Sequence, residues 1–348
     1  MNTGPKFSAL HLMNITYALE DLVDNGKHVK VVEQISRDLL DKLEKGVLTD
    51  FVSRTQVIME VNALANAKLG NIEVAMKNIV KSGTIKNSAR ESNYFQDSKA
   101  KYYTRYSLIL AASGEYKKAL DTLTKALRNA DSNPKLVSTY KEIYKAVKGS
   151  MKGADKEIKM LQDEAYHHYY KELQSSYITT TGTREGFLPA TKKNSKPFKI
   201  FTSKIPFDEI ELPDLKGNMV RFADYKGKVL VIDFWSTVCT PCMAAFAGFE
   251  KVVAEYKNDP FQLFIIDLYE PLNTVKSLVA KKEVKLDVLH DESDKSFSIQ
   301  ATPTKIVFDP MGNIRFYSAG YAGSTDREYY KLKAMVEITK AHASVDAR

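Results

Sequence analysis

The chain has 348 residues, of which 44% are hydrophobic and 27% charged, a composition that excludes disorder throughout. This length exceeds what one hydrophobic core usually supports, so two domains are expected. The sequence has no run of about 18 apolar residues, so no transmembrane segment is expected. Its start, MNTGPKFSALHLMN, lacks the basic and then apolar pattern of a signal peptide.

The net charge of +8 is unevenly distributed along the chain. Counting Lys and Arg against Asp and Glu, residues 1–200 carry +10 and residues 201–348 carry −2. A basic half can indicate a nucleic-acid partner. Here the lysines alternate with acids at helical spacing, and no aromatic–basic recognition motif is present. We therefore interpret the excess as solvated helix faces and expect no nucleic acid as partner.

Residues 8–176 have the apolar spacing of successive helices. Two segments, LANAKLGNIEVAMKNIVKSG and LILAASGEYKKALDTLTKAL, share one pattern. Each places a glycine (Gly70, Gly114) in a short turn and a small alanine (Ala75, Ala119) five residues later. Glycine permits the tight turn and alanine the close approach of two antiparallel helices.

The second segment resembles the tetratricopeptide repeat. The positions that match its consensus are Tyr103, Gly114, Tyr116, Ala119, Leu123 and Ala126. The two glycines lie 44 residues apart rather than the usual 34, which indicates a degenerate or interrupted array. The resemblance implies an all-α helical-hairpin domain over residues 1–177 that offers a surface to a protein partner.

The amino-acid composition changes after this helical part. Residues 178–199 are rich in Thr, Gly, Pro, Lys and Ser, which predicts a linker or an extended segment lying across the next domain. From residue 200 to 348 strands and helices alternate and end in an antiparallel pair. This order predicts a mixed central sheet with helices on both faces, and hence a two-domain α plus α/β chain.

Both cysteines of the chain lie in FWSTVCTPC, three positions apart. Cys239 is expected where a buried strand, KVLVIDFW, ends and a helix begins, and Cys242 in the first turn of that helix. The free N–H groups there stabilise a thiolate, and Cys242 is close enough to resolve a mixed disulfide. A structural disulfide would close too short a loop to stabilise much. A zinc site needs two further ligands. The nearest histidine in the sequence, His290, lies in the acidic stretch HDESD, which we expect at the surface.

The run VLVIDFWSTVCTPC, followed by ATPTKIVFDPMGNI, resembles the thioredoxin fold, and most closely its TlpA/ResA-like branch of redoxins. The resemblance implies that Cys239 is the attacking thiolate and Cys242 the resolving thiol of a redox-active disulfide. It also implies that Pro303 is a cis-proline facing the cysteines, that Thr302 binds substrate in strand fashion, and that Trp235 packs beside the dithiol as part of the substrate site. A peroxiredoxin is disfavoured, because that family needs a proline seven residues before its cysteine.

Asp233 matches the buried acid that thioredoxins use as proton acceptor for the second cysteine, and burial suits a carboxylate to that role. The alternative, a carboxylate hydrogen-bonded only for structure, remains open. Three positions depart from the family pattern: Val238 replaces a tryptophan, Ala245 a glutamate and Ala247 a proline. Without that glutamate, Asp233 is the natural acid–base residue.

The expected function is thiol–disulfide exchange with protein substrates, with no cofactor and no metal. The resemblance implies a reductase in the periplasm or cell envelope, with a cytoplasmic location as the alternative. The alternative function is an interaction protein, in which the helical domain recruits a partner and the thioredoxin-like domain is a redox-inactive platform.

Overall fold

The structure, a computed structural model, describes residues 8–85, 97–190 and 196–346. The start of the chain (1–7) and residues 191–195 of the expected linker lie outside the described residues. By their internal contacts the described residues form two compact units, one up to residue 161 and one from residue 162 onward. Nowhere in the described ranges is a helix both long and apolar enough to cross a bilayer.

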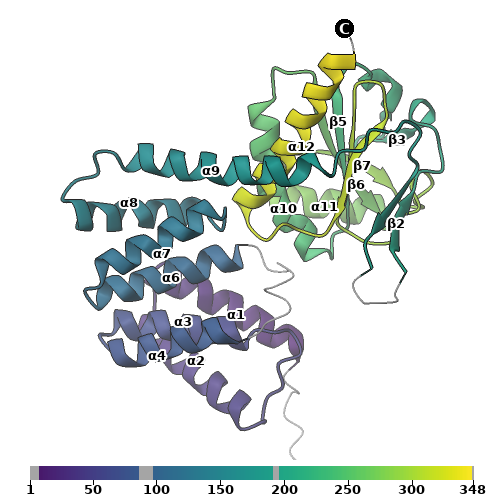
Figure 1. The fold of residues 1–348 in the computed structure, drawn as a ribbon. Helices are drawn as coiled ribbons and strands as arrows, with labels where there is room; N and C mark the ends of the chain where they lie inside the picture. The colour runs from purple at the N-terminus through teal and green to yellow at the C-terminus, as the bar shows by residue number, and fades with distance from the viewer. Residues whose placement is uncertain (1–7, 86–96, 191–195, 347–348) are drawn as a thin grey trace, which may run out of the picture. The chain divides into compact units, whose positions relative to one another are not determined.

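The first unit consists of helices in sequence (Figure 1). They are α1 (Ala9–Asp24), α2 (Val29–Glu44), α3 (Thr55–Lys68), α4 (Ile72–Thr84), α6 (Ser98–Ala112), α7 (Tyr116–Arg128), α8 (Pro134–Lys148) and the start of α9 (Ala154–Gln174). The turns α3–α4 and α6–α7 contain Gly70 and Gly114 with φ of +86° and +83°, a conformation that favours glycine. Ala75 and Ala119 are fully buried, as the helix-approach argument predicts. The tetratricopeptide resemblance itself stays a prediction.

Two apolar clusters hold the helical unit together. One is built mainly from α1 to α4, and the other from α6, α7, α8 and the first turns of α9. Helix α3 is buried along almost its whole length, because helices pack on it from more than one side. The later part of α9 belongs to the second unit, where Leu173 joins the core.

The second unit is built on a five-stranded sheet of order β7-β6-β5-β8-β9. Its strands are β5 (Val229–Trp235), β6 (Phe261–Leu268), β7 (Asp287–Asp291), β8 (Thr304–Phe308) and β9 (Ile314–Ala319). Strands β5, β6 and β7 run parallel, whereas β8 and β9 are antiparallel to their neighbours. The predicted mixed sheet is confirmed, although the short strand β7 was not expected. Every residue of β5 is buried, as its apolar run predicts.

The faces of the sheet are covered differently. Helices α10 (Thr240–Glu255), α11 (Leu272–Lys282) and α12 (Thr325–Asp346) all contribute to the apolar cluster on one face. The crossovers β5–α10–β6 and β6–α11–β7 proceed in the same direction along the sheet, and their common handedness puts both helices on one side. All three of these α-helices therefore lie on the same face. The opposite face carries hairpins and only two short 3-10 helices, η1 (Phe207–Glu209) and η2 (Phe222–Tyr225).

Two hairpins complete that opposite face. Strands β1 (Glu185–Leu188) and β2 (Phe198–Thr202) pair antiparallel, as do β3 (Glu211–Pro213) and β4 (Met219–Arg221). The carbonyls of residues 178–180 accept hydrogen bonds from the guanidinium of Arg315. Of the two forms expected for residues 178–199, the described part thus takes the extended one, lying on the C-terminal unit.

Candidate active site

The two cysteines lie where the sequence places them, between β5 and α10. Cys239 is the N-cap residue of α10, and its sulfur accepts a hydrogen bond from the N–H of Cys242 at 3.3 Å. Pro241 occupies the first turn, where its missing N–H does no harm. The cysteines form a disulfide, with their Cα atoms 5.3 Å apart. A reduced Cys239 would face the same N–H groups, which favour its thiolate.

The two sulfurs differ in access. Cys242 is fully buried, whereas Cys239 is half-buried and follows Val238, a valine whose side chain is 82% exposed. An exposed sulfur can meet a substrate disulfide, and a buried one can react only with its neighbour. This asymmetry supports the assignment of Cys239 as attacking and Cys242 as resolving residue. Val238 was predicted only as a departure from the family pattern, but its exposed apolar side chain beside Cys239 is suited to contact substrate.

The proline loop lies next to this strand end. Thr304 of β8 is the partner of Phe234 on β5, so Pro303 stands beside the end of β5 from which the chain leads to Cys239. The Thr302–Pro303 bond is cis. Thr302 is exposed, in keeping with the expected backbone contact to substrate. Trp235 is fully buried and packs edge-on to Phe246, with 5.2 Å between the ring centres. In this disulfide form it therefore supports the site by packing and does not reach a substrate.

Asp233 lies behind the dithiol on β5. Its carboxyl is buried, and its Oδ2 atom has no hydrogen-bond partner among the described residues. Burial raises the pKa of Asp233 to about 8, against the attraction of Lys305, while Glu328 raises it further. A carboxyl with such a pKa exchanges protons near neutrality, which fits the expected role of acceptor for the Cys242 proton.

Two charged residues near Asp233 were missed by the sequence interpretation. Lys305 is the Cα partner of Asp233 across β5 and β8, and its ammonium forms a buried ion pair with Glu328 of α12. A signal for Lys305 existed, since a lysine inside the apolar run TKIVFD requires a partner if that strand is buried. Nothing local to Glu328 marks it as that partner.

A second polar cluster lies at the ends of β6 and β7. His290 is buried on β7, and its Nδ1 atom lies 3.1 Å from Oδ1 of Asp267. The interpretation of HDESD as a surface stretch is therefore wrong for His290, because the unexpected strand β7 carries it inside. Nevertheless, the described residues contain no group of three His, Cys, Asp or Glu side chains arranged to hold a metal ion.

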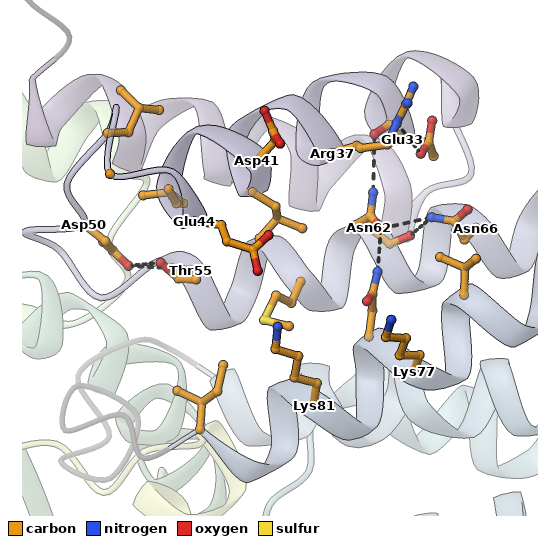
Figure 2. A pocket seen from close by; sticks show the side chains of 18 of the residues that line it. Glu33, Arg37, Asp41, Glu44, Asp50, Thr55, Asn62, Asn66, Lys77 and Lys81 are labelled. Atoms are coloured by element: carbon orange, nitrogen blue, oxygen red, sulfur yellow. Dashed lines mark hydrogen bonds and ion pairs between the residues drawn. The ribbon is translucent and has the colours of Figure 1, made fainter.

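The helical unit has a groove of about 840 Å³ between α2, α3 and α4 (Figure 2). The α2 wall carries Glu33, Asp41 and Glu44, together with Arg37, whereas the α4 wall carries Lys77 and Lys81. Figure 2 shows these walls on either side of the asparagines of α3. The charges of the two walls are therefore largely of opposite sign.

The floor of this groove is a closed hydrogen-bond network. Asn62 donates to the carbonyl of Glu33 and to Oγ of Ser36, and its own Oδ1 accepts from Asn66 and Asn78. All four hydrogen bonds available to the amide of Asn62 are made within the unit. The network fixes the helices that form the groove, and the charged side chains of its walls take no part in it.

Comparisons with known proteins find similarity over part of this chain. Residues 204–317 match a family model described as AhpC/TSA family. The Thiol-disulfide oxidoreductase ResA of Halalkalibacterium halodurans is 26% identical over 125 residues, which cover 35% of this chain and 71% of the relative. ResA of Bacillus cereus (strain ZK / E33L) is 28% identical over 104 residues, which cover 29% of this chain and 60% of the relative.

Solved structures give matches of similar extent. A putative thiol:disulfide interchange protein DsbE from Chlorobium tepidum is 23% identical, with a TM-score of 0.33, and the match covers 38% of this chain and 97% of that one. A putative thioredoxin from Neisseria meningitidis is 30% identical, with a TM-score of 0.34, and covers 40% of this chain and 91% of that one.

Proposed function

We propose that the chain, whose C-terminal unit is a thioredoxin-fold redoxin of the TlpA/ResA-like kind, is a thiol–disulfide oxidoreductase acting on protein substrates. The observation that carries the proposal is the cysteine pair at the N-terminus of α10, with Cys239 accessible and Cys242 buried. The pair needs no bound cofactor for exchange chemistry, because its two sulfurs supply both electrons.

In the direction we propose, the protein acts as a reductase. The thiolate of Cys239 attacks one sulfur of a substrate disulfide, forms a mixed disulfide and releases the other substrate sulfur as a thiolate. Cys242 then gives its thiol proton to Asp233, and its thiolate attacks the sulfur of Cys239. The mixed disulfide breaks, the substrate leaves with both electrons, and the protein is left with the Cys239–Cys242 disulfide.

Thiol counting with insulin as the disulfide substrate tests the proposal. Reduced protein should lose two thiols for each insulin disulfide that it opens, and two thiols should appear on insulin. If the reduced protein keeps both thiols while insulin stays oxidised, the oxidoreductase assignment falls and the redox-inactive platform becomes the better account.

The periplasm or cell envelope is the proposed location, because the TlpA/ResA-like branch is envelope-associated. Fractionation of the native organism tests it. Recovery of the chain with periplasmic or membrane fractions supports the proposal, and recovery with a cytoplasmic marker enzyme supports the alternative location.

For the helical unit we propose that the groove selects the protein substrate. Its occupant would be an extended substrate segment whose acidic residues face Lys77 and Lys81 and whose basic residues face the α2 wall, since the walls carry opposite charges. Deletion of residues 1–180 is a poor test, because it would also remove Leu173 from the core of the other unit.

Point variants avoid that difficulty. In a Cys242→Ser background, which traps substrates as mixed disulfides, Lys77→Glu with Lys81→Glu should reduce the trapping of native proteins while the reaction with oxidised glutathione stays unchanged. Lys117→Glu, at an exposed lysine of α7 that does not line the groove, is the matched control. Equal trapping by the groove variant and the control would exclude the groove as selector.

A further inference from the structure

Three charged groups share one apolar compartment behind the dithiol. Asp233 and Lys305 are direct partners on β5 and β8, and Glu328 reaches the same place from α12. All three are buried to at least 95%. The sheet face on which they lie is the one that α10 covers, and α10 carries Cys242.

Lys305 is held firmly between its neighbours. Its ammonium pairs with Oε1 of Glu328 and lies 4.5 Å from the centre of the Phe249 ring. The other oxygen of Glu328 accepts a hydrogen bond from the N–H of Ala322 at 2.9 Å. Gly248 makes room for Glu328, because a Cβ atom there would come within 2.8 Å of the Cβ of Glu328. The ion pair thus joins β8 to α12 and lies against Phe249 and Gly248 of α10.

The compartment holds two carboxyl groups and one ammonium. Glu328 is directly paired with Lys305, whereas Oδ2 of Asp233 has no hydrogen-bond partner among the described residues. Of the elements packed on Asp233, β8 offers the charge of Lys305 and α12 that of Glu328, while the partner on β6 is the uncharged Ile265. Helix α10 carries Cys242, which has a thiol only once the disulfide is reduced. Asp233 is therefore the carboxyl that gains or loses a proton when the balance changes.

On the basis of the proposed exchange reaction, we propose that Lys305 and Glu328 are positioning residues that act in opposite directions on the proton at Asp233. Lys305 favours the carboxylate that accepts the proton of Cys242, and Glu328, by engaging Lys305, favours the protonated carboxyl. The pair keeps Asp233 able both to accept a proton during resolution and to return it afterwards. This takes the place of the glutamate that Ala245 replaces.

The test follows the step in which Cys242 resolves a mixed disulfide. Reduced protein is mixed with oxidised glutathione, and Trp235 fluorescence is recorded by stopped flow over a range of pH values. Lys305→Met should move the midpoint of the pH profile for the resolution phase upward by about one pH unit, and Glu328→Gln should move it downward by a similar amount. A lost structural contact would lower the rate at every pH and leave the midpoint in place.

The neighbouring ion pair Lys251–Asp326 provides the matched control, since it also holds α12, here to α10, but its lysine side chain is 40% exposed. Lys251→Met should leave the midpoint unchanged. Midpoints that stay fixed, or that move in the same direction in both variants, overturn the inference. If Lys305→Met does not fold, the nearly isosteric Glu328→Gln decides by itself, since only a downward shift agrees with the proposal. A wild-type protein that does not react with glutathione at all would instead contradict the oxidoreductase function.

Discussion

Glu270 holds the loop that leads to Cys239 through two hydrogen bonds from one residue, Thr237. The N–H of Thr237 donates to Oε2 of Glu270 at 2.5 Å, and the hydroxyl of Thr237 donates to Oε1. Asp267 lies beside them, and burial, with the nearby carboxyl of Glu270 acting in the same direction, raises the pKa of Asp267 to about 9. Burial therefore favours the protonated form of Asp267 near neutral pH.

This relationship predicts that Glu270→Ala slows thiol–disulfide exchange, although both cysteines are still present. The loop would lose both hydrogen bonds, and a misplaced sulfur costs roughly 10- to 100-fold in rate. Stopped-flow reduction of insulin would measure the effect. Thr237→Ser retains the N–H and the hydroxyl, so it should react at nearly the wild-type rate. Wild-type rates for Glu270→Ala would mean that the loop holds its position without this anchor.

The cysteine variants should differ in what they accumulate. Cys239→Ser removes the attacking sulfur and should abolish exchange, because the remaining sulfur of Cys242 is buried. Cys242→Ser should react once and stop as a mixed disulfide, since no second thiolate can release the substrate. Mass spectrometry after reaction with oxidised glutathione would show one added glutathione on Cys242→Ser only. An adduct on Cys239→Ser alone would reverse the two assignments.

Asp233→Asn is expected to slow exchange and yet stabilise the fold. Amide in place of carboxyl removes the proton acceptor, for a loss of roughly 100-fold near neutrality. Because the pKa of Asp233 is raised to about 8 in the folded protein, the wild type loses stability as the pH rises from about 4 through 8 and the carboxyl must ionise while buried. The variant has no carboxyl to ionise at this position. Its free energy of unfolding at pH 8 should therefore exceed that of the wild type by on the order of a few kcal/mol.

Urea unfolding at pH 5 and pH 8 would test the second half of this prediction, with insulin reduction testing the first. The stability difference between variant and wild type should be larger at pH 8. If Asp233→Asn is instead less stable than the wild type at both pH values and exchanges at the normal rate, the purely structural interpretation of Asp233 is correct.

The sequence shows the parts of this site whose signals are local. An apolar run interrupted once, VLVIDFW, predicts the buried strand β5, and the cysteines after it mark the start of α10. Pro303 and its cis bond follow from resemblance, because nothing local to a Thr-Pro pair distinguishes a cis bond from a trans bond.

The residues that were missed depend on non-local contacts. Lys305 meets Asp233 only through the register of two strands 72 positions apart, and Glu328 is brought to them by the packing of α12. His290 was misplaced because β7 is short and carries charges at its ends, so its residues lack the apolar pattern of a buried strand. Which face of the sheet a helix covers depends on the direction in which its crossover runs along the sheet. The order of elements along the chain does not specify that direction.

Trp235, the only tryptophan of the chain, should report the redox state. It shares an apolar cluster with Cys242, and Cys239 packs against that cluster, so opening the disulfide changes its surroundings. Fluorescence in graded thiol–disulfide buffers should follow a reversible two-electron transition. For the proposed reductase the midpoint should lie near about −270 mV, whereas a value near about −120 mV would make the protein an oxidant.

The helical unit offers a test that is independent of the redox chemistry. Arg105 is buried, and its guanidinium contacts Glu20 at 3.0 Å, Asp24 at 2.7 Å and Glu60 at 3.3 Å. Arg105→Met should destabilise this unit by about 3–5 kcal/mol, because it leaves buried carboxylates without their cation. Far-UV circular dichroism, dominated by the helices, would record the loss, while Trp235 reports on the other unit. Lys42→Met, which breaks an exposed pair with Asp38, should cause no measurable change.

The same cluster gives the helical unit a sensitivity to acid. Burial alone would raise the pKa of Glu20, but the attraction of Arg105, Lys101 and Arg54 outweighs it and lowers that pKa to about 2. A carboxyl with a lowered pKa contributes stability above its unfolded value and loses it as the pH falls. The unfolding temperature of the wild-type helices, followed by circular dichroism, should therefore fall as the pH is lowered from about 4.5 to 2. Arg105→Met should show little further loss over that range, because its Glu20 has already lost the main source of the attraction. An equal acid dependence in both proteins would mean that other carboxylates govern the unfolding of the helices.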